Sequence, residues 1–351
     1  MTTTEQTGVP LAPLTTMRVG GPAARLVTVT TTDELVDAVR EVDDAGEPLL
    51  VVAGGSNLVV ADDGFAGTVI RVATRGLRVE SADYCGGATV RVAAGEPWDG
   101  FVEHAVEQGW AGVEALSGIP GLAGATPIQN VGAYGQEVAQ TIAQVRVWDR
   151  HDEAVRTWAN TDCGFAYRGS RLKGTDRYVV LEVVFQLEVA DVCRPIVYAA
   201  LASGLGVELG SRVPLADARA AVIAQRRQRG MVLDPADHDT WSCGSFFTNP
   251  VLSVEEFAAL AAKAPEVPRW PEPDGRVKTS AAWLIDHAGF AKGHGLPGPV
   301  SLSTKHTLAV TNRGGATAGD VLGLAREVRD GVERAYGVRL VNEPVLVGLA
   351  L

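Results

Sequence analysis

The segment from Ser117 to Glu137 constrains the fold more than any other part of the chain. It reads SGIPGLAGATPIQNVGAYGQE, which is too apolar for a linker and too rich in glycine and proline for a regular element. Glycine permits backbone conformations that other residues avoid, and proline lacks the backbone N–H that helices and sheets use. We therefore expect a long ordered loop inside a folded domain, the kind of loop that commonly carries binding residues.

Helix and strand signals alternate on both sides of this loop. Apolar residues at helical spacing follow Asp33, the expected N-cap of a first helix, and a second helix is predicted over residues 98–108. Short runs of apolar and β-branched residues predict strands, which lie at 49–53, 58–60, 68–72, 89–92, 141–148, 154–158 and 178–187. A mixed α+β region closing near residue 190 is indicated.

The composition shifts after that point. A polar helix with several arginines is predicted over residues 215–229, and Ser253 with Glu256 has the spacing of a capping box. A final long helix is expected between Thr317 and Gly337, followed by a strand over 345–349. Residues 1–13 are polar and aperiodic, so we expect them to form a flexible leader.

Charge and cysteine usage exclude several classes of protein. The formal net charge is −11, which disfavours nucleic acid as a partner. The four cysteines are scattered without metal-ligand spacing, so no metal site is predicted, and reduced thiols fit a cytoplasmic protein. No run of ~18 apolar residues occurs, and we expect no membrane insertion.

A shorter glycine motif, Gly54-Gly55-Ser56-Asn57, follows the predicted strand at 49–53. Glycines there would let backbone N–H groups approach phosphate oxygens. A tight turn between two strands explains the same letters equally well, and both interpretations stay open. The spacing differs from GxGxxG, which disfavours a Rossmann fold.

The Ser117–Glu137 segment is similar to the flavin loop of the UDP-N-acetylenolpyruvoylglucosamine reductases. The resemblance extends from TTMRVGG at residues 15–21 to Asn342-Glu343-Pro344. It implies an α+β chain in which residues 14–192 form a two-subdomain FAD-binding fold of the vanillyl-alcohol oxidase (PCMH) type, split near residues 75–90. A connecting helix and substrate loop would span 193–235, and a C-terminal α/β substrate-binding domain would span 236–351.

The same resemblance implies non-covalent FAD. Its pyrophosphate would be held by Gly54, Gly55, Ser56 and Asn57. The residues expected to line the flavin are Ser117, Gly118, Ile119, Pro120, Gly124, Ala125, Gln129, Asn130, Gly132 and Ala133.

Three further motifs match the catalytic positions of the family. Arg168 lies in Tyr-Arg-Gly-Ser and would stabilise negative charge near the substrate carboxylate. Ser245 lies in Gly-Ser-Phe-Phe and would donate a proton, while Glu343 would assist it. From the residues alone, these would be a surface arginine, a turn serine and an exposed loop carboxylate. Cys243 is expected to be a packed thiol.

Four residues are implied to bind the substrate: Tyr134, Tyr198, Arg229 and Asn249. Tyr198 matches a tyrosine that covers the substrate in one subtype of the family. Arg229 stands where many relatives have a lysine that contacts a diphosphate, and an arginine can bind phosphate in a bidentate fork.

The implied activity is reduction of enolpyruvyl UDP-N-acetylglucosamine to UDP-N-acetylmuramate, with NADPH as electron donor, for peptidoglycan synthesis in the cytoplasm. A monomer or weak homo-oligomer is expected. Two alternatives stay open at this point. One is a sugar or lactone oxidase of the same FAD fold, and the other is a flavin-binding module without catalysis.

Overall fold

The computed structural model describes residues 4–351, and the chain divides into two compact units. The first unit contains the described residues up to Val9 together with 23–54 and 66–228. The second contains 10–22, 55–65 and 229–351. No helix in the described range is both long and apolar enough to cross a membrane.

The first sheet of the first unit contains a strand, β1, that the sequence pattern does not predict. Its strand order is β1 (Thr4–Pro10), β2 (Pro22–Val29), β5 (Phe65–Val72) and β3 (Leu49–Val52). The prediction of a flexible leader over residues 1–13 is therefore wrong for residues 4–13, which contain β1 and most of a 3-10 turn at Ala12–Leu14. Residues 1–3 lie outside the described part. An edge strand is held by backbone pairing, so a polar and exposed sequence can form one.

Helix α1 (Thr32–Asp44) confirms the predicted helix but not its cap. The N-cap is Thr31, whose side chain accepts a hydrogen bond from the backbone N–H of Glu34. The Glu34 carboxylate accepts from the backbone N–H of Thr31 in return. Asp33 lies in the first turn, where its charge still favours the helix N-terminus.

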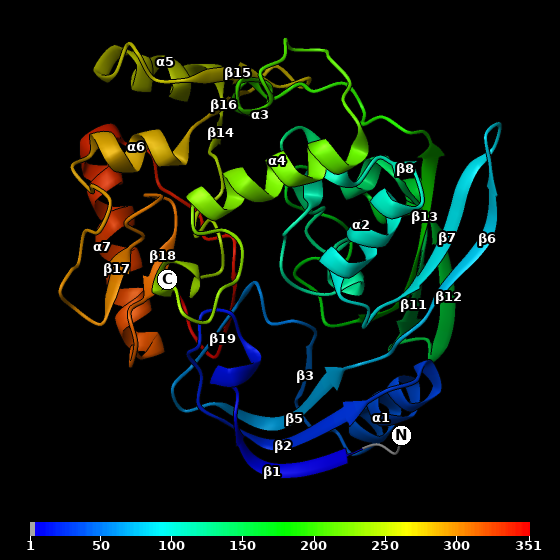
Figure 1. The fold of residues 1–351 in the computed structure, drawn as a ribbon. Coiled ribbons are helices and arrows are strands. Elements are labelled where there is room, and N and C mark those ends of the chain that lie inside the picture. Colours follow the sequence, from blue (N-terminus) through cyan, green and yellow to red (C-terminus); the bar gives the residue numbers. More distant parts are fainter. Residues whose placement is uncertain (1–3) are drawn as a thin grey trace. The chain divides into compact units, whose positions relative to one another are not determined.

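The second sheet of the first unit is antiparallel (Figure 1). Its strands supply many residues of the main hydrophobic cluster of that unit. Its strands, in spatial order, are β12 (Ala154–Ala159), β11 (Ile142–Asp149), β13 (Tyr178–Val189), β7 (Gly87–Ala93) and β6 (Leu77–Asp83), with β8 (Trp110–Ala111) beside β13. Helix α2 (Trp98–Glu107) covers one face. Its Trp98 and Phe101 rings pack on Phe185 of β13 at 5.7 and 4.9 Å between centroids. The predicted strands at 141–148, 154–158 and 178–187 are confirmed.

Two helices after residue 192 also belong to the first unit. Helix α3 (Ala199–Leu205) and α4 (Leu215–Gln228) pack through Leu201, Leu215 and Val222 into one apolar cluster with Ala111 and Ala115. The predicted FAD region ends at residue 192, whereas this compact unit continues to residue 228, because these apolar side chains bury their surface against residues far earlier in the chain.

The second unit contains α5 (Val254–Lys263), α6 (Ala281–His287) and α7 (Ala318–Tyr336). Its strands are β14 (Val251–Leu252), β15 (Arg269–Pro271), β16 (Val277–Thr279), β17 (Val300–Leu302), β18 (Val310–Asn312) and the parallel pair β4 (Leu58–Val60) and β19 (Val345–Val347). The predicted capping box at Ser253 and the predicted start of the last helix at Thr317 are confirmed, and Gly337 ends α7 in the left-handed conformation.

Residues 10–22 and 55–65 complete this unit, although the predicted boundaries placed most of them in the FAD region. The last strand β19 pairs with β4, and the Asn312 side chain donates to the carbonyl oxygen of Met17 over 3.0 Å. Such pairing between distant segments cannot be detected in local sequence patterns.

Candidate active site

The glycine-rich loop of the first unit is fixed to the elements around it. The backbone N–H of Gly118 donates to Oδ1 of Asp99 in α2 over 2.5 Å. Gly124 donates from its N–H to the carbonyl oxygen of Ala94 over 2.9 Å, and a Cβ at Gly124 would lie 2.5 Å from the Ala94 Cβ. The loop is thus an ordered wall of the domain, as the sequence predicts.

The second glycine motif begins against this wall. A Cβ on Gly54 would lie 2.7 Å from the Cα of Gly121, so the backbone after β3 touches the backbone of the loop. Only glycine fits at this crossing without a shift of the chain. Two segments that the sequence proposed for the cofactor therefore meet within the first unit.

Left-handed backbone conformations gather at the predicted site. Among residues 4–351, the non-glycine residues with positive φ are Arg18, Asn130, Tyr134, Glu153 and Arg168. Three of these five belong to the predicted site. Each such conformation costs on the order of 1 kcal/mol or more and persists only where its surroundings fix it, which is typical of binding sites.

Asn130 holds its part of the loop through its side chain. It is 1% exposed and donates from Nδ2 to Oε2 of Glu137 over 2.8 Å and to the carbonyl oxygen of Ala166 over 3.1 Å. Its Oδ1 accepts from the N–H of Ala139. The amide therefore joins the loop to the segment that carries Arg168.

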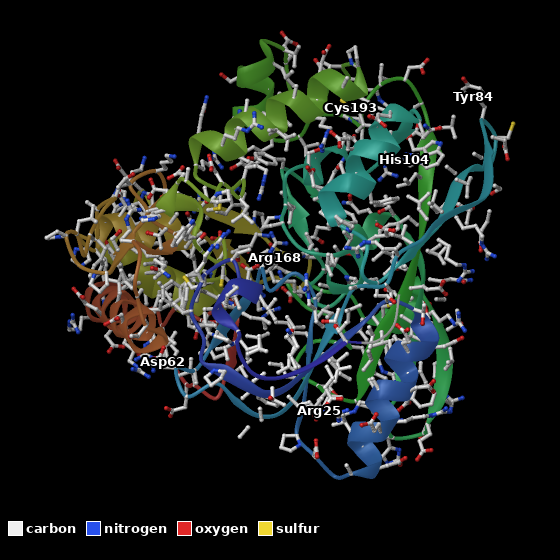
Figure 2. The ribbon with its side chains drawn as sticks, turned by 60° about the horizontal axis from the view of Figure 1, so that its bottom comes forward. Arg25, Asp62, Tyr84, His104, Arg168 and Cys193 are labelled. Carbon is white, nitrogen blue, oxygen red and sulfur yellow. The ribbon has the colours of Figure 1, made fainter. Side chains whose placement is uncertain are left out.

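Arg168 lies beside the same loop (Figure 2). Its Nη2 donates to the carbonyl oxygen of Gly132 over 2.7 Å, and its Nη1 donates to that of Asn130 over 3.4 Å. The carboxylate of Glu137 lies 3.7 Å from Nη1. A Cβ at Gly132 would come within 2.9 Å of Nη1, so this glycine makes room for the guanidinium.

Two of the predicted substrate residues contact each other. Tyr134 lies at the turn between β9 (Gly132–Ala133) and β10 (Gln136–Glu137), and Tyr198 immediately precedes α3. Their rings are 5.2 Å apart between centroids and nearly perpendicular, at 88°. The Tyr198 side chain is partly exposed, which suits a residue that meets a ligand.

In the second unit, an isolated bridge and a backbone hydrogen bond bring the segments of Ser245 and Glu343 side by side. The N–H of Glu343 donates to the carbonyl oxygen of Phe246 over 2.9 Å, and Phe247 and Asn342 form an antiparallel bridge. The Phe246 and Phe247 rings are fully buried and anchor the segment that follows Ser245. The proposed proton donor and the proposed assisting carboxylate thus come from adjacent backbone segments.

The Gly55-Ser56-Asn57 segment lies next to Glu343 in this unit. Nδ2 of Asn57 donates to the Glu343 carbonyl oxygen over 3.2 Å, and Val345 donates from its N–H to the carbonyl oxygen of Asn57 over 2.9 Å. Gly55 has φ +58, and a Cβ there would collide with the Leu14 carbonyl oxygen.

Within residues 4–351, the N–H groups of Gly55 and Ser56 donate to no other residue. Successive N–H groups in such a turn suit phosphate oxygens, so these residues fit the pyrophosphate of a dinucleotide.

Cys243 is the packed thiol that the sequence predicts. Its Sγ donates to the carbonyl oxygen of Leu58 over 3.4 Å. Burial, together with the nearby charge of Glu343, raises the pKa of the Cys243 thiol to about 12. The thiol is therefore protonated at neutral pH and is no candidate nucleophile.

The remaining two substrate residues have structural partners. Oδ1 of Asn249 accepts from the backbone N–H of Ala281 over 3.0 Å at the start of α6. Burial lowers the pKa of His306 to about 4, and the charges of Arg229 and Lys292 contribute. Arg229 thus lies near enough to His306 to affect its pKa, and the contact of Arg229 with substrate stays a prediction.

One buried carboxylate beside the loop belongs to none of the motifs above. Glu114 is 2% exposed and accepts three N–H hydrogen bonds. The one sequence feature that could have identified Glu114 is its charge within the otherwise apolar run Gly112-Val113-Glu114-Ala115-Leu116.

Comparisons with known proteins agree with this geometry. Residues 23–157 match the model of an FAD binding domain, and residues 234–347 match the model described as UDP-N-acetylenolpyruvoylglucosamine reductase, C-terminal domain. The chain is 59% identical to the UDP-N-acetylenolpyruvoylglucosamine reductase of Thermobifida fusca, over 100% of both chains. It is also 59% identical to that of Streptomyces coelicolor, over 97% of this chain and 90% of the relative.

The solved structure of UDP-N-acetylenolpyruvylglucosamine reductase from Thermus caldophilus superposes with a TM-score of 0.66 at 28% identity, and 99% of each chain is covered. The predicted FAD-binding fold with a C-terminal domain is confirmed by these matches. With full-length identity of 59% to one member, the chain belongs to the family of UDP-N-acetylenolpyruvoylglucosamine reductases.

Proposed function

We propose that this protein reduces enolpyruvyl UDP-N-acetylglucosamine to UDP-N-acetylmuramate, a step in peptidoglycan precursor synthesis that takes place in the cytoplasm. The observation that supports this most directly is the backbone pairing of the Ser245 segment with the Glu343 segment. Reduction of an enol ether needs a proton donor for the carbon that does not receive the hydride. Ser245 is proposed for that role, with Glu343 assisting it. Family membership supports the substrate.

When bound without a covalent link, FAD would supply the hydride chemistry that connects NADPH with the substrate carbon β to the carboxylate. On the protein side, the N–H groups of Gly55 and Ser56 would bind pyrophosphate oxygens, and the Ser117–Ala133 loop would line the flavin. The positive φ of Gly55 and the close approach of Gly54 to Gly121 support this assignment.

Addition of hydride at the β-carbon leaves carbanionic charge on the α-carbon and the carboxylate. Arg168 would stabilise that charge, since its guanidinium is pre-oriented by the carbonyl oxygens of Gly132 and Asn130. A preorganised donor of this kind commonly contributes about 3–4 kcal/mol to lowering the barrier.

Ser245 would deliver the proton to the α-carbon from its hydroxyl. Glu343 would assist by holding or replacing that proton, as its backbone is joined to Phe246 directly after Ser245. Tyr134, Tyr198, Arg229 and Asn249 would bind the UDP-sugar.

Anaerobic stopped-flow absorbance of the flavin tests this function. The flavin is first reduced with NADPH and then mixed with the enol ether. We expect rapid reoxidation in the wild-type protein and a loss of roughly 100- to 10,000-fold in Ser245→Ala, the usual contribution of a general acid. NADPH-driven reduction of the flavin should stay unchanged in this variant.

The alternatives give different results. Reoxidation by oxygen but not by the enol ether would identify a sugar or lactone oxidase. A yellow protein that NADPH cannot reduce, or that neither the enol ether nor oxygen reoxidises rapidly, would identify a non-catalytic flavin-binding module.

A further inference from the structure

Glu114 connects three segments of the first unit. Its Oε2 accepts from the backbone N–H of Gly112 over 2.6 Å. Its Oε1 accepts from Nε2 of Gln136 over 2.9 Å and from the backbone N–H of Arg194 over 2.8 Å. Gln136 bonds back, because its Oε1 accepts from the N–H of Ala115 over 2.9 Å. One buried carboxylate thus links residues 22 and 80 positions away.

The first of the distant segments is the hairpin that carries Tyr134. Tyr134 and Gly135 form its two-residue turn with φ +49 and +87, a combination typical of type I′ turns. Asparagine, aspartate or glycine usually occupies the first of these positions, so a tyrosine there needs support from its surroundings. Gln136 follows directly, and its bond to Glu114 fixes the hairpin next to the turn.

The second distant segment leads to Tyr198. Glu114 holds it at the N–H of Arg194, four residues before the tyrosine. The two segments touch at their far ends. A Cβ on Gly135 would lie 2.2 Å from Cγ2 of Val197, and the Tyr134 and Tyr198 rings contact each other.

Between these contacts the packing is open. A cavity of about 250 Å³ lies there, lined by Glu114, Tyr134, Gln136, Arg194, Val197 and Leu201 among others. Cys193, labelled in Figure 2, also lines it. The Glu114 carboxylate lines this cavity and bonds to both tyrosine-bearing segments, in addition to the apolar contacts between them.

We infer that Glu114 is a positioning residue for substrate binding: it holds the Tyr134 hairpin and the Tyr198 segment at the separation that lets both rings meet the UDP-sugar. This inference rests on the proposed function, in which Tyr134 and Tyr198 bind the substrate. Glu114 itself is enclosed by N–H donors and needs no contact with the ligand.

Glu114→Gln tests the inference with little change in shape. Its amide NH₂ replaces one accepting oxygen and faces an N–H donor, so at least one of the three bonds is lost. We expect KM for the enol ether to rise about 5- to 100-fold, the range for leaving one buried donor unpaired. Both kcat and the rate of flavin reduction by NADPH should change less than about threefold. Glu208→Gln, an exposed glutamate of the same unit, is the matched control and should leave all three unchanged.

A double-mutant cycle separates positioning from general loss of stability. If Glu114 acts through Tyr198, Glu114→Gln should raise KM far less in a Tyr198→Ala background than in the wild type. Equal effects in both backgrounds, an unchanged KM in Glu114→Gln, or an equal loss in flavin reduction would overturn the inference.

Fluorine NMR of protein labelled with 3-fluorotyrosine gives a readout without substrate. Signals of Tyr134 and Tyr198, assigned with Tyr→Phe variants, should shift toward the values of exposed tyrosines in Glu114→Gln, and the other tyrosines should not. Unshifted signals would overturn the inference. A wild-type protein that cannot reduce the enol ether would refute the proposed function instead, and the NMR result would still decide whether Glu114 positions the rings.

Discussion

Nη2 of Arg168 donates a hydrogen bond to the carbonyl oxygen of Gly132 over 2.7 Å. The arginine that would meet the developing charge is therefore oriented by the Ser117–Glu137 loop. Its own φ of +50 and that of Asn130, at +47, are held by bonds between the same two segments. Loop and guanidinium form one preorganised group.

Replacing Arg168 by lysine should separate the effect of its positive charge on the reaction from the effect of the fixed orientation of its guanidinium. Arg168→Lys keeps a cation but loses the planar fork that reaches both Gly132 and Asn130, so we expect kcat for the enol ether to fall about 100- to 1,000-fold. Flavin reduction by NADPH should change less than about twofold in the same stopped-flow experiment. Arg171→Lys is the control, because Arg171 packs over the Trp158 ring at 4.6 Å. A similar loss in both variants would show that the effect is not specific to Arg168.

Gly54→Ala should weaken FAD binding. The new Cβ would lie 2.7 Å from the Cα of Gly121, so the backbone after β3 or the flavin loop must move. Overpacking of this kind costs about 1–3 kcal/mol, which corresponds to a Kd roughly 5- to 150-fold higher if the shift falls on the cofactor site. Equilibrium dialysis of flavin measures it.

Gly100→Ala in α2 is the matched control, since its Cβ would approach only Pro97, at 3.7 Å. This variant should bind FAD as the wild type does. An unchanged Kd in Gly54→Ala would contradict the assignment of the Gly54–Gly121 crossing to the cofactor site.

Local sequence patterns predict a helix or strand correctly where its side chains are buried, because burial selects apolar residues. Strand β13 is buried along most of its length, so a run of apolar and β-branched residues identifies it in the sequence. Strand β1 is polar and almost fully exposed, and backbone pairing alone defines it. The parallel pairing of β19 with β4 joins segments that are far apart in the sequence. No window of adjacent residues can predict such a pairing.

The site divides in the same way. Arg168, Ser245 and Glu343 lie in motifs whose resemblance to a family identifies them. Glu114 depends on bonds to Gln136 and Arg194, residues far from it in the chain, so its position could be known only from the fold.

The four cysteines should differ sharply in reactivity. Cys85 is exposed, whereas Cys163, Cys193 and Cys243 are buried. Burial raises the pKa of Cys163 to about 11 and that of Cys243 to about 12, so their reactive thiolates are scarce at pH 8. We expect one thiol to react quickly with Ellman's reagent in the folded protein and four after unfolding. Cys85→Ser should abolish the fast reaction, and a second fast thiol would contradict the described burial.

His306 should make stability depend on pH in the second unit. Burial, with the charges of Arg229 and Lys292, lowers its pKa from 6.5 to about 4 in the folded protein. As the pH falls from 6.5 to 4, the unfolded chain binds a proton that the folded chain does not, so the free energy of unfolding decreases. The decrease amounts to on the order of 3 kcal/mol once the pH is below both values.

Chemical unfolding followed by tryptophan fluorescence, at several values between pH 4 and 7.5, measures this dependence. In His306→Gln the free energy of unfolding should change less between pH 6.5 and 4 than in the wild type, because that proton uptake is gone. His151→Gln, whose side chain is 77% exposed, should keep the wild-type slope. Parallel pH profiles for His306→Gln and the wild type would mean that His306 binds protons equally in the folded and unfolded states. That result would contradict the lowered pKa of His306 in the folded protein.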